Sequence, residues 1–257
     1  MRIKIIIEYD GTGFAGWQRQ DNSNNTVQET LEKAIEKVFD YRERITLYGA
    51  GRTDAGVHAT GQVAHFDILS DLLVERWMRN AHKLVRAVNF YLIETGVVVL
   101  GADIVPDDFH ARFSAKMRHY EYIILNRETS SVIVARHSWH VSKTLDILPM
   151  RKAAEYFVGK HNLSAFRSAE CSANNTERNI SSVVVDKIGQ LITISVSARS
   201  FLHNQVRIMV GTLRMIGAGE KEPEIIPVLL ESGDRRNAGP TAPACGLYLR
   251  RIDYESP

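Results

Sequence analysis

A glycine-rich segment from Tyr48 to Ala59 holds the residue types best suited to chemistry. Within it stand Arg52 and Asp54, a cation and a carboxylate two positions apart, whose side chains point to the same side of an extended chain. A nearby guanidinium lowers the pKa of a carboxyl group, which favours an aspartate that stays ionised as a nucleophile or base. The glycines at 49, 51 and 56 permit positive φ and close approach of a ligand. Alternatively, Asp54 only caps a turn.

Two other patterns could indicate a cofactor or a metal. The string Gly11–Gly16 satisfies GxGxxG after a predicted strand, but a dinucleotide site needs a helix that opens at the glycines. Here polar residues 17–25 come first, so no nucleotide cofactor is expected. His58 and His65 lack a third ligand, so no metal is expected. His58 could read a substrate or serve as a hydrogen-bonded structural histidine.

Composition and the chain's first residues indicate the compartment. Cys171 and Cys245 form no CxxC pair and are typical of reduced, inert thiols. The first eight residues carry charges and read as a strand rather than a signal peptide. No apolar run approaches the roughly 18 residues of a membrane span. These features predict a cytoplasmic protein with no membrane association.

Hydrophobic periodicity places the loop between two elements of an α+β chain. Helices are predicted over 26–40, 71–88, 149–158, 206–216 and 225–230. Strands are predicted over 3–9, 45–50, 62–68, 117–125, 179–186, 191–198 and 247–252, with a loop at 51–61 and a hairpin turn at 187–190. The irregular alternation and the hairpin favour a mixed fold over a parallel doubly wound sheet.

These elements form two similar halves. We expect each to be an α/β unit with a mixed, largely antiparallel sheet packed by helices, the two enclosing a central active-site cleft. The expected boundaries are 1–105, carrying the catalytic loop, and 106–257. With 257 residues, 44% hydrophobic composition and a net charge of +2, the chain is an ordinary globular protein, which excludes disorder, collagen and a long coiled coil. The net charge by itself argues neither for nor against a nucleic-acid partner.

The run Gly51–Ala59 resembles the active-site signature of the tRNA pseudouridine synthase A family. Further segments resemble that family in the expected order, over nearly the whole chain: 8–11, 16–20, 109–115, 120–122, 166–167, 178–180, 201–207 and 246–249. The chain departs from the family at 89–93, which lacks the second asparagine and the proline of Asn-x-Asn-Leu-Pro, so RNA contacts of that loop are in doubt. Asn204 and Gln205 stand where the family often has His-Met.

The resemblance implies an isomerase that converts uridine to pseudouridine at positions 38, 39 and 40 in the anticodon stem-loop of tRNA. The N1–C1′ bond breaks, the uracil turns, and C5 is joined to C1′, with no cofactor or metal. The family works as a homodimer, and one tRNA spans both subunits. The residues alone leave a second class open: a non-catalytic RNA-binding protein with a structural Asp54.

The resemblance also assigns roles to single residues. Asp54 is implied as the catalytic nucleophile, whether it attacks the base or the sugar. Arg207 is implied as its ion-pair partner and Tyr120 as the ring that stacks on the target base. We expect Arg52 to contact the RNA and Tyr122 to lie in the core. A locally basic groove is expected from the cations Arg52, Arg112, Lys116, Arg118 and Arg207.

Overall fold

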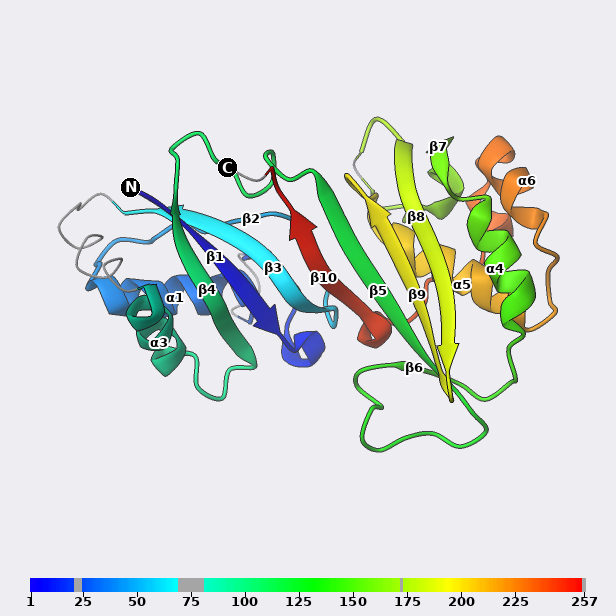
Figure 1. Cartoon of the computed structure of the whole chain (residues 1–257), viewed down its shortest axis with the longest axis horizontal. Helices are drawn as coiled ribbons and strands as arrows, with labels where there is room; N and C mark the ends of the chain where they lie inside the picture. The colour runs from blue at the N-terminus through cyan, green and yellow to red at the C-terminus, as the bar shows by residue number, and fades with distance from the viewer. Residues whose placement is uncertain (21–24, 69–80, 172, 256–257) are drawn as a thin grey trace. The chain divides into compact units, whose positions relative to one another are not determined.

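The computed structural model describes residues 1–20, 25–68, 81–171 and 173–255, which divide into two units (Figure 1). The first unit contains residues 1–116 and 249–257, and the second contains residues 117–248. The division therefore differs from the expected halves 1–105 and 106–257. The first unit extends to Lys116 and also takes the C-terminal segment, because the last strand lies beside a strand of that unit.

The first unit is a largely antiparallel sheet with helices packed against it. Its elements are β1 (Arg2–Tyr9), β2 (Tyr48–Gly49), β3 (His58–Asp67), β4 (Val97–Val105), β10 (Leu247–Asp253), the 3-10 turn η1 (Gly11–Gly13), and the helices α1 (Val27–Phe39) and α3 (Ala81–Tyr91). The strand order is β4-β1-β3-β10, and β2 pairs with β3. Figure 1 shows α1 and α3 side by side next to β4 and β1.

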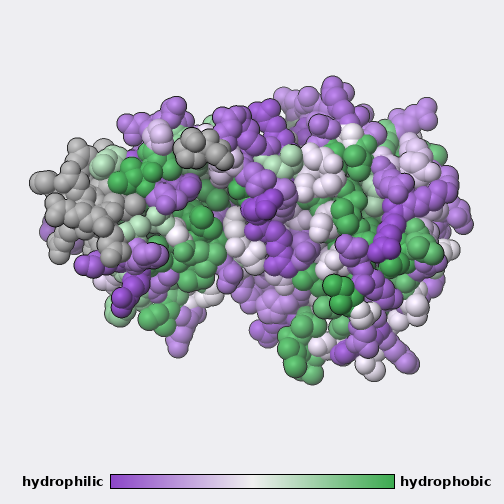
Figure 2. Space-filling model, in the orientation of Figure 1, coloured by the Kyte–Doolittle hydropathy of each residue, from purple (hydrophilic) through white to green (hydrophobic). Residues whose placement is uncertain are grey.

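The alternation along β1 decides which side of this sheet is covered. Ile3, Ile5 and Ile7 are buried, whereas Lys4 and Ile6 are partly exposed. Successive side chains of a strand point to opposite faces, so Ile3, Ile5 and Ile7 fill the core, whereas Lys4 and Ile6 point to the other face. Figure 2 shows hydrophobic surface over β4 and β1, where Leu100 is also exposed.

Helix α1 begins as its sequence predicts. Thr26 is the N-cap, and its Oγ1 accepts a hydrogen bond from the N–H of Glu29 at 3.3 Å. The helix ends at Phe39, followed by Asp40 in the left-handed conformation. Leu31 and Ile35 recur at helical spacing and are fully buried. The cap and the apolar stripe together place α1 on the sheet.

The second unit is also a sheet covered by helices. Its strands are β5 (Met117–Asn126), β6 (Trp139–Val141), β7 (Gly159–Asn162), β8 (Glu177–Ile188) and β9 (Leu191–Ala198), and its helices are α4 (Ile147–Glu155), α5 (Gln205–Gly217) and α6 (Ile225–Ser232). The second unit also contains the short 3-10 helices η2 (Ser164–Phe166), η3 (Arg235–Asn237) and η4 (Ala244–Gly246). The order is β5-β9-β8-β7, all antiparallel, and β6 pairs parallel with β5. Helices α4 and α5 pack against each other and this sheet. The predicted α+β class with mixed, largely antiparallel sheets is thereby confirmed.

The elements differ from the predictions in two ways. The strands β4, β6 and β7 were not predicted, and the bounds of the elements around the Asp54 loop differ. The predicted strand 45–50 is reduced to β2, because the N–H groups of Ile45 and Leu47 bond to carboxylates of α1 instead of a neighbouring strand. β3 begins at His58, earlier than the predicted 62, and shortens the loop. The first part of the predicted helix 71–88 lies outside the described residues. Among the described helices, none is long and apolar enough to cross a membrane.

Candidate active site

The segment that carries Asp54 is a short loop between β2 and β3, bonded to β3 at its start and closed by a turn at its end. The N–H of Ala50 donates to the carbonyl of Val63 at 2.8 Å, and the Gln62 side chain donates to the carbonyl of Gly51 at 2.9 Å. At the far end the N–H of Val57 donates to the carbonyl of Asp54 at 3.1 Å. Gly56 has φ +78°, which favours glycine at this turn.

The end of β1 and the segment after it also bond to this loop. The hydroxyls of Tyr9 and Thr53 form a buried hydrogen bond of 2.7 Å, and the N–H of Trp17 donates to the carbonyl of Thr53 at 3.0 Å. Gly16 has φ +109°, and a Cβ on it would lie 2.9 Å from the Thr53 carbonyl oxygen. The Asp54 backbone is therefore fixed on a close-packed support.

The glycines of the GxGxxG string serve this support. A Cβ on Gly11 would overlap the carbonyl of Val57, 2.0 Å away, whereas Gly13 has open space. The string forms the 3-10 turn η1, and the next described helix begins at Val27. A nucleotide site of this type needs a helix N-terminus at the glycines, which this arrangement does not provide. Gly11 and Gly16 instead allow two backbone segments to approach each other.

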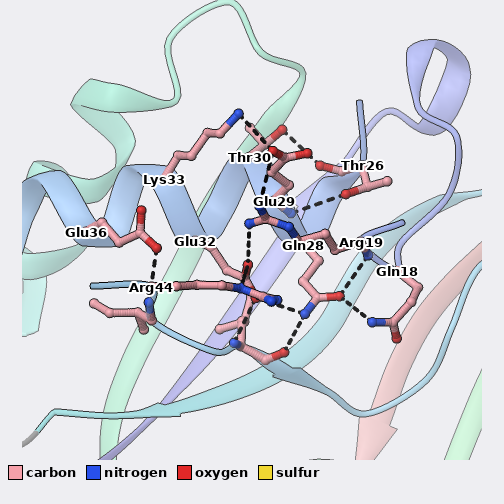
Figure 3. A network of polar contacts seen from close by, with 12 residues as sticks. Gln18, Arg19, Thr26, Gln28, Glu29, Thr30, Glu32, Lys33, Glu36 and Arg44 are labelled. Carbon is pink, nitrogen blue, oxygen red and sulfur yellow. Dashed lines mark hydrogen bonds and ion pairs between the residues drawn. The ribbon is translucent and has the colours of Figure 1, made fainter. Parts of the chain in front are cut away.

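A buried polar network fixes the chain on both approaches to this site (Figure 3). The side chain of Glu32 on α1 is fully buried, and its oxygens accept hydrogen bonds from the Leu47 N–H at 3.1 Å and from the Arg44 guanidinium at 2.9 and 3.1 Å. Arg19 lies 3.3 Å from the same carboxylate. A buried carboxylate is costly unless it is paired and hydrogen-bonded, and Glu32 is both.

Gln28 extends the network to the segment after Trp17. Its Nε2 donates to Glu32 at 2.9 Å and to the carbonyl of Leu47 at 3.0 Å. Its Oε1 accepts from the Arg19 N–H at 2.9 Å and from the Gln18 side chain at 2.8 Å, as Figure 3 shows. One helix thus holds both the segment that enters β2 and the segment that supports the loop.

The side chains of Asp54 and Arg52 differ in exposure. Asp54 is half-buried and Arg52 is exposed. Within the part of the chain that the structure describes, Arg52 forms no hydrogen bond or ion pair. Arg52 therefore does not pair with Asp54, although the two side chains were expected to point to the same side of the loop. Arg52 is left available for a ligand.

In the second unit Tyr120 and Tyr122 lie two residues apart on β5. Tyr120 is mostly buried and packs edge-on against Phe201, with ring centroids 5.1 Å apart. Tyr122 is fully buried, donates its hydroxyl to the carbonyl of Pro243 at 2.7 Å, and has a pKa raised by burial. Tyr122 is a core residue, as predicted.

Arg207, on the first turn of α5, is held on two sides. Its Nε donates to the carbonyl of Ala242 at 2.7 Å, and its Nη1 donates to Oδ1 of Asn204 at 2.7 Å. Asn204 is the N-cap of α5 and has φ +60°, a left-handed conformation that asparagine tolerates better than most residues. Asn204, one of the two residues that depart from the family pattern, thus helps to orient Arg207, whereas the Gln205 side chain bonds to Leu202 and Met209.

The other predicted cations have different environments. Arg112 is exposed, and Lys116 is exposed but paired with Glu255 at 2.5 Å. Arg118 is buried and donates to the carbonyl of Arg199, so it is not the surface cation that we expected. Strand alternation explains the difference, because Arg118 shares a face of β5 with the buried tyrosines 120 and 122.

His58 and Asn89 have structural contacts. The Nδ1 of His58, which is buried, lies 3.1 Å from the Gly11 nitrogen and 3.1 Å from an Asp10 oxygen. The Asn89 side chain exchanges hydrogen bonds with the backbone of Val99 at 2.8 and 2.9 Å. In the atypical segment 89–93, Asn89 therefore fastens α3 to β4.

The fold and site define an α+β scaffold that presents a half-buried aspartate on a rigid, glycine-lined loop beside an exposed arginine. A family model described as tRNA pseudouridine synthase matches residues 5–114 and 153–255. The chain belongs to the tRNA pseudouridine synthase family. The sequence-based predictions of this family and of an isomerase are confirmed.

Individual relatives match over the whole chain. The tRNA pseudouridine synthase A of Wolbachia pipientis wMel is 48% identical over 255 residues, covering 99% of this chain and 100% of its own. That of Neorickettsia sennetsu is 47% identical over 254 residues, with the same coverage. A solved structure, the crystal structure of a Cbf5-Nop10-Gar1 complex, covers 82% of this chain and 44% of its own at 10% identity. Its TM-score of 0.33 is too low to support an argument.

The residues that sequence reasoning missed are the supporting ones. Tyr9, Gly16 and Trp17 hold the loop that carries Asp54, and Glu32 holds Leu47, directly before β2. No local pattern singled out Glu32, because its burial and its pairing depend on Arg19, Arg44 and Leu47, which lie 12 to 15 positions away in the chain.

Proposed function

We propose that this protein converts uridine to pseudouridine at positions 38, 39 and 40 in the anticodon stem-loop of tRNA, with Asp54 as the catalytic nucleophile. The family supports pseudouridine formation, and the fixed backbone of Asp54 supports its assignment. In the reaction the N1–C1′ bond breaks and a C5–C1′ bond forms. C5 loses its proton and N1 gains one, so the product is an isomer of the substrate.

The observation that carries this proposal is the rigid mounting of a half-buried carboxylate. A nucleophile must be held near the reacting atom, since misplacement by 1 Å can cost about 10²-fold in rate. The turn at 54–57 and the close approach of Gly16 provide that rigidity. An aspartate that only capped a turn would not need two further segments packed against its backbone.

Three residues complete the proposed site. Arg207, whose guanidinium is oriented by Ala242 and Asn204, is proposed as the ion-pair partner of Asp54. Tyr120 stacks on the extruded uracil. Arg52, exposed on the loop, contacts the RNA backbone. A uridine paired in the stem must leave its helix first, at a cost of a few kcal/mol, which such contacts offset.

The first test is Asp54→Asn, which keeps the size of the side chain and removes its charge. We expect no pseudouridine in a tRNA transcript and tRNA binding within about tenfold of wild type, because the lost group acts on bonds rather than on affinity. Asp103→Asn is the matched control, since Asp103 is an exposed carboxylate of the same unit, paired with Lys4. Pseudouridine formation by Asp54→Asn would refute the catalytic assignment.

A tritium-release assay on C5-labelled tRNA separates this enzyme from the alternative, a non-catalytic RNA-binding protein. The enzyme releases tritium, because C5 exchanges its hydrogen for the bond to C1′. A binding protein retains tRNA without release. The predicted homodimer and the predicted cytoplasmic location belong to the same proposal.

A further inference from the structure

Four rings of the first unit form a continuous cluster outside the Asp54 loop, here called the ring platform: Tyr48, His65, His110 and Phe113. Tyr48 stacks on His65, with centroids 5.1 Å apart and planes 20° apart. His110 meets His65 edge-on at 4.7 Å, and Phe113 packs on His110 at 4.4 Å. These distances fall within or just below the usual range for paired aromatic rings.

Hydrogen bonds hold the inner rings in place. The N–H of Ala111 donates to Nδ1 of His65 at 3.2 Å, and the N–H of Arg112 donates to Nδ1 of His110 at 3.1 Å. The segment itself is closed by the N–H of Ser114 donating to the carbonyl of His110 at 2.9 Å. The platform is therefore rigid before any ligand arrives, which reduces the entropy lost on binding.

The outer rings are open to solvent. Phe113 is 71% exposed and Tyr48 is 46% exposed, whereas His65 is buried. Large aromatic side chains exposed together are an interaction surface rather than a core. A free face on a rigid ring offers stacking area to another flat, apolar ring.

The charges around the platform suit an anionic, aromatic ligand. The guanidinium of Arg112 lies 5.8 Å from the Phe113 ring centroid. Arg2 lies nearby and is paired with Asp67, so its positive charge balances the negative charge of that carboxylate. Burial, and after it neighbouring charges that include Arg2, lower the pKa of His65 and of His110, which favours the neutral form of both rings. Asp107 and Asp108 lie on the turn before Phe109, and Asp107 interacts with Arg2.

We propose that the ring platform stacks an unpaired base of the RNA substrate, a binding site separate from the catalytic loop. This inference rests on the proposed function. Tyr48 lies six residues before Asp54, so their Cα atoms are at most about 21 Å apart. One RNA molecule can therefore contact the platform and the Asp54 loop together. Stacking is tolerant of base identity, so the platform anchors RNA without reading its sequence.

The test compares Phe113→Leu with a matched control, Phe90→Leu, which removes an equally exposed ring (67%) from α3 of the same unit. We expect Phe113→Leu to raise the KM for tRNA about tenfold with kcat within about twofold, because base stacking contributes to binding of RNA. Phe113→Tyr keeps the ring and should restore the KM. Phe90→Leu should behave as wild type.

Several outcomes overturn the platform. The first is an unchanged KM for tRNA in Phe113→Leu, and the second is an equal rise of the KM in Phe90→Leu. The third is a loss of self-association of Phe113→Leu, measured by sedimentation, that accounts for its higher KM. Failure of the wild-type enzyme to make pseudouridine would instead refute the proposed function, and the two failures are thus distinct. A second measurement needs no variant: photocrosslinking of wild-type protein to tRNA carrying 5-iodouridine. Crosslinks to the peptides holding Tyr48 or Phe113 support the platform, and crosslinks confined to other peptides contradict it.

Discussion

At the residue scale, His65 is an imidazole whose burial has a measurable consequence. Burial, then the charges of His110 and Arg2, lowers its pKa from 6.5 to about 4. Its Nδ1 accepts the Ala111 N–H, which requires the neutral ring. The histidine therefore supports the fold and the ring platform in its uncharged form.

This shift predicts a pH dependence of stability. The pKa of His65 is lower in the folded chain than in the unfolded chain, so the unfolded chain binds the proton first as the pH falls. The stabilisation that His65 provides is therefore complete above about pH 6.5 and is lost as the pH falls toward 4. The free energy of unfolding should decrease by roughly 3 kcal/mol over that interval. In His65→Asn, whose Oδ1 can still accept the Ala111 N–H, denaturation curves between pH 4 and 7 should show a flatter slope.

The control is His82→Asn, an exposed histidine on α3, which should keep the wild-type slope. An unchanged slope in His65→Asn would show that His65 does not bind its proton differently in the folded and unfolded chains. Because His110 shares the cluster and also has a lowered pKa, part of the total pH dependence should remain in His65→Asn.

At the element scale, the loop between β2 and β3 depends on the turn after β1. Gly16→Ala introduces a Cβ 2.9 Å from the Thr53 carbonyl oxygen at a φ of +109°, so the loop that bears Asp54 must move. We expect the free energy of unfolding to fall by about 1–3 kcal/mol. Turnover should fall at least about tenfold more than stability explains, because the nucleophile is displaced.

Gly13→Ala is the matched control for this prediction. It lies in the same GxGxxG string, but a Cβ there has no neighbour within 4 Å. It should leave unfolding and pseudouridine formation near wild type. If the two alanine variants behave alike in denaturation and turnover, the close contact of Gly16 with the loop affects neither stability nor catalysis.

At the scale of the whole molecule, the net charge of +2 does not show which cations are exposed. Arg52 and Arg112 are exposed, Lys116 is paired with Glu255, and Arg118 is buried. We expect the logarithm of tRNA affinity to fall with the logarithm of salt concentration with a slope of about −2 or steeper, since each phosphate contact releases about 0.9 counterion.

The contribution of one residue to this slope can be measured. Arg52→Gln should reduce its magnitude by about 1 in binding titrations across salt concentrations. Lys83→Gln removes one positive charge from exposed α3 of the same unit and should leave the slope unchanged. A salt-independent affinity of the wild-type protein would contradict the whole electrostatic account.

Local patterns determined much of this protein. The residues 51–59, the cap of α1 at Thr26 and the hairpin of β8 and β9 were all predictable, because each depends on residue types a few positions apart. The period of the isoleucines likewise set the buried face of β1. The family and the α+β class followed from these same short segments.

Only the tertiary structure decided which distant segments share a unit. It returned residues 249–257 to the first unit, turned the GxGxxG glycines into a support for the Asp54 loop, and gave the N–H groups of Ile45 and Leu47 to carboxylates of α1. It also buried Arg118 and joined Tyr48 to Phe113 through two histidines. Each of these depends on contacts between segments far apart in the chain, and such contacts leave no periodic trace in the sequence.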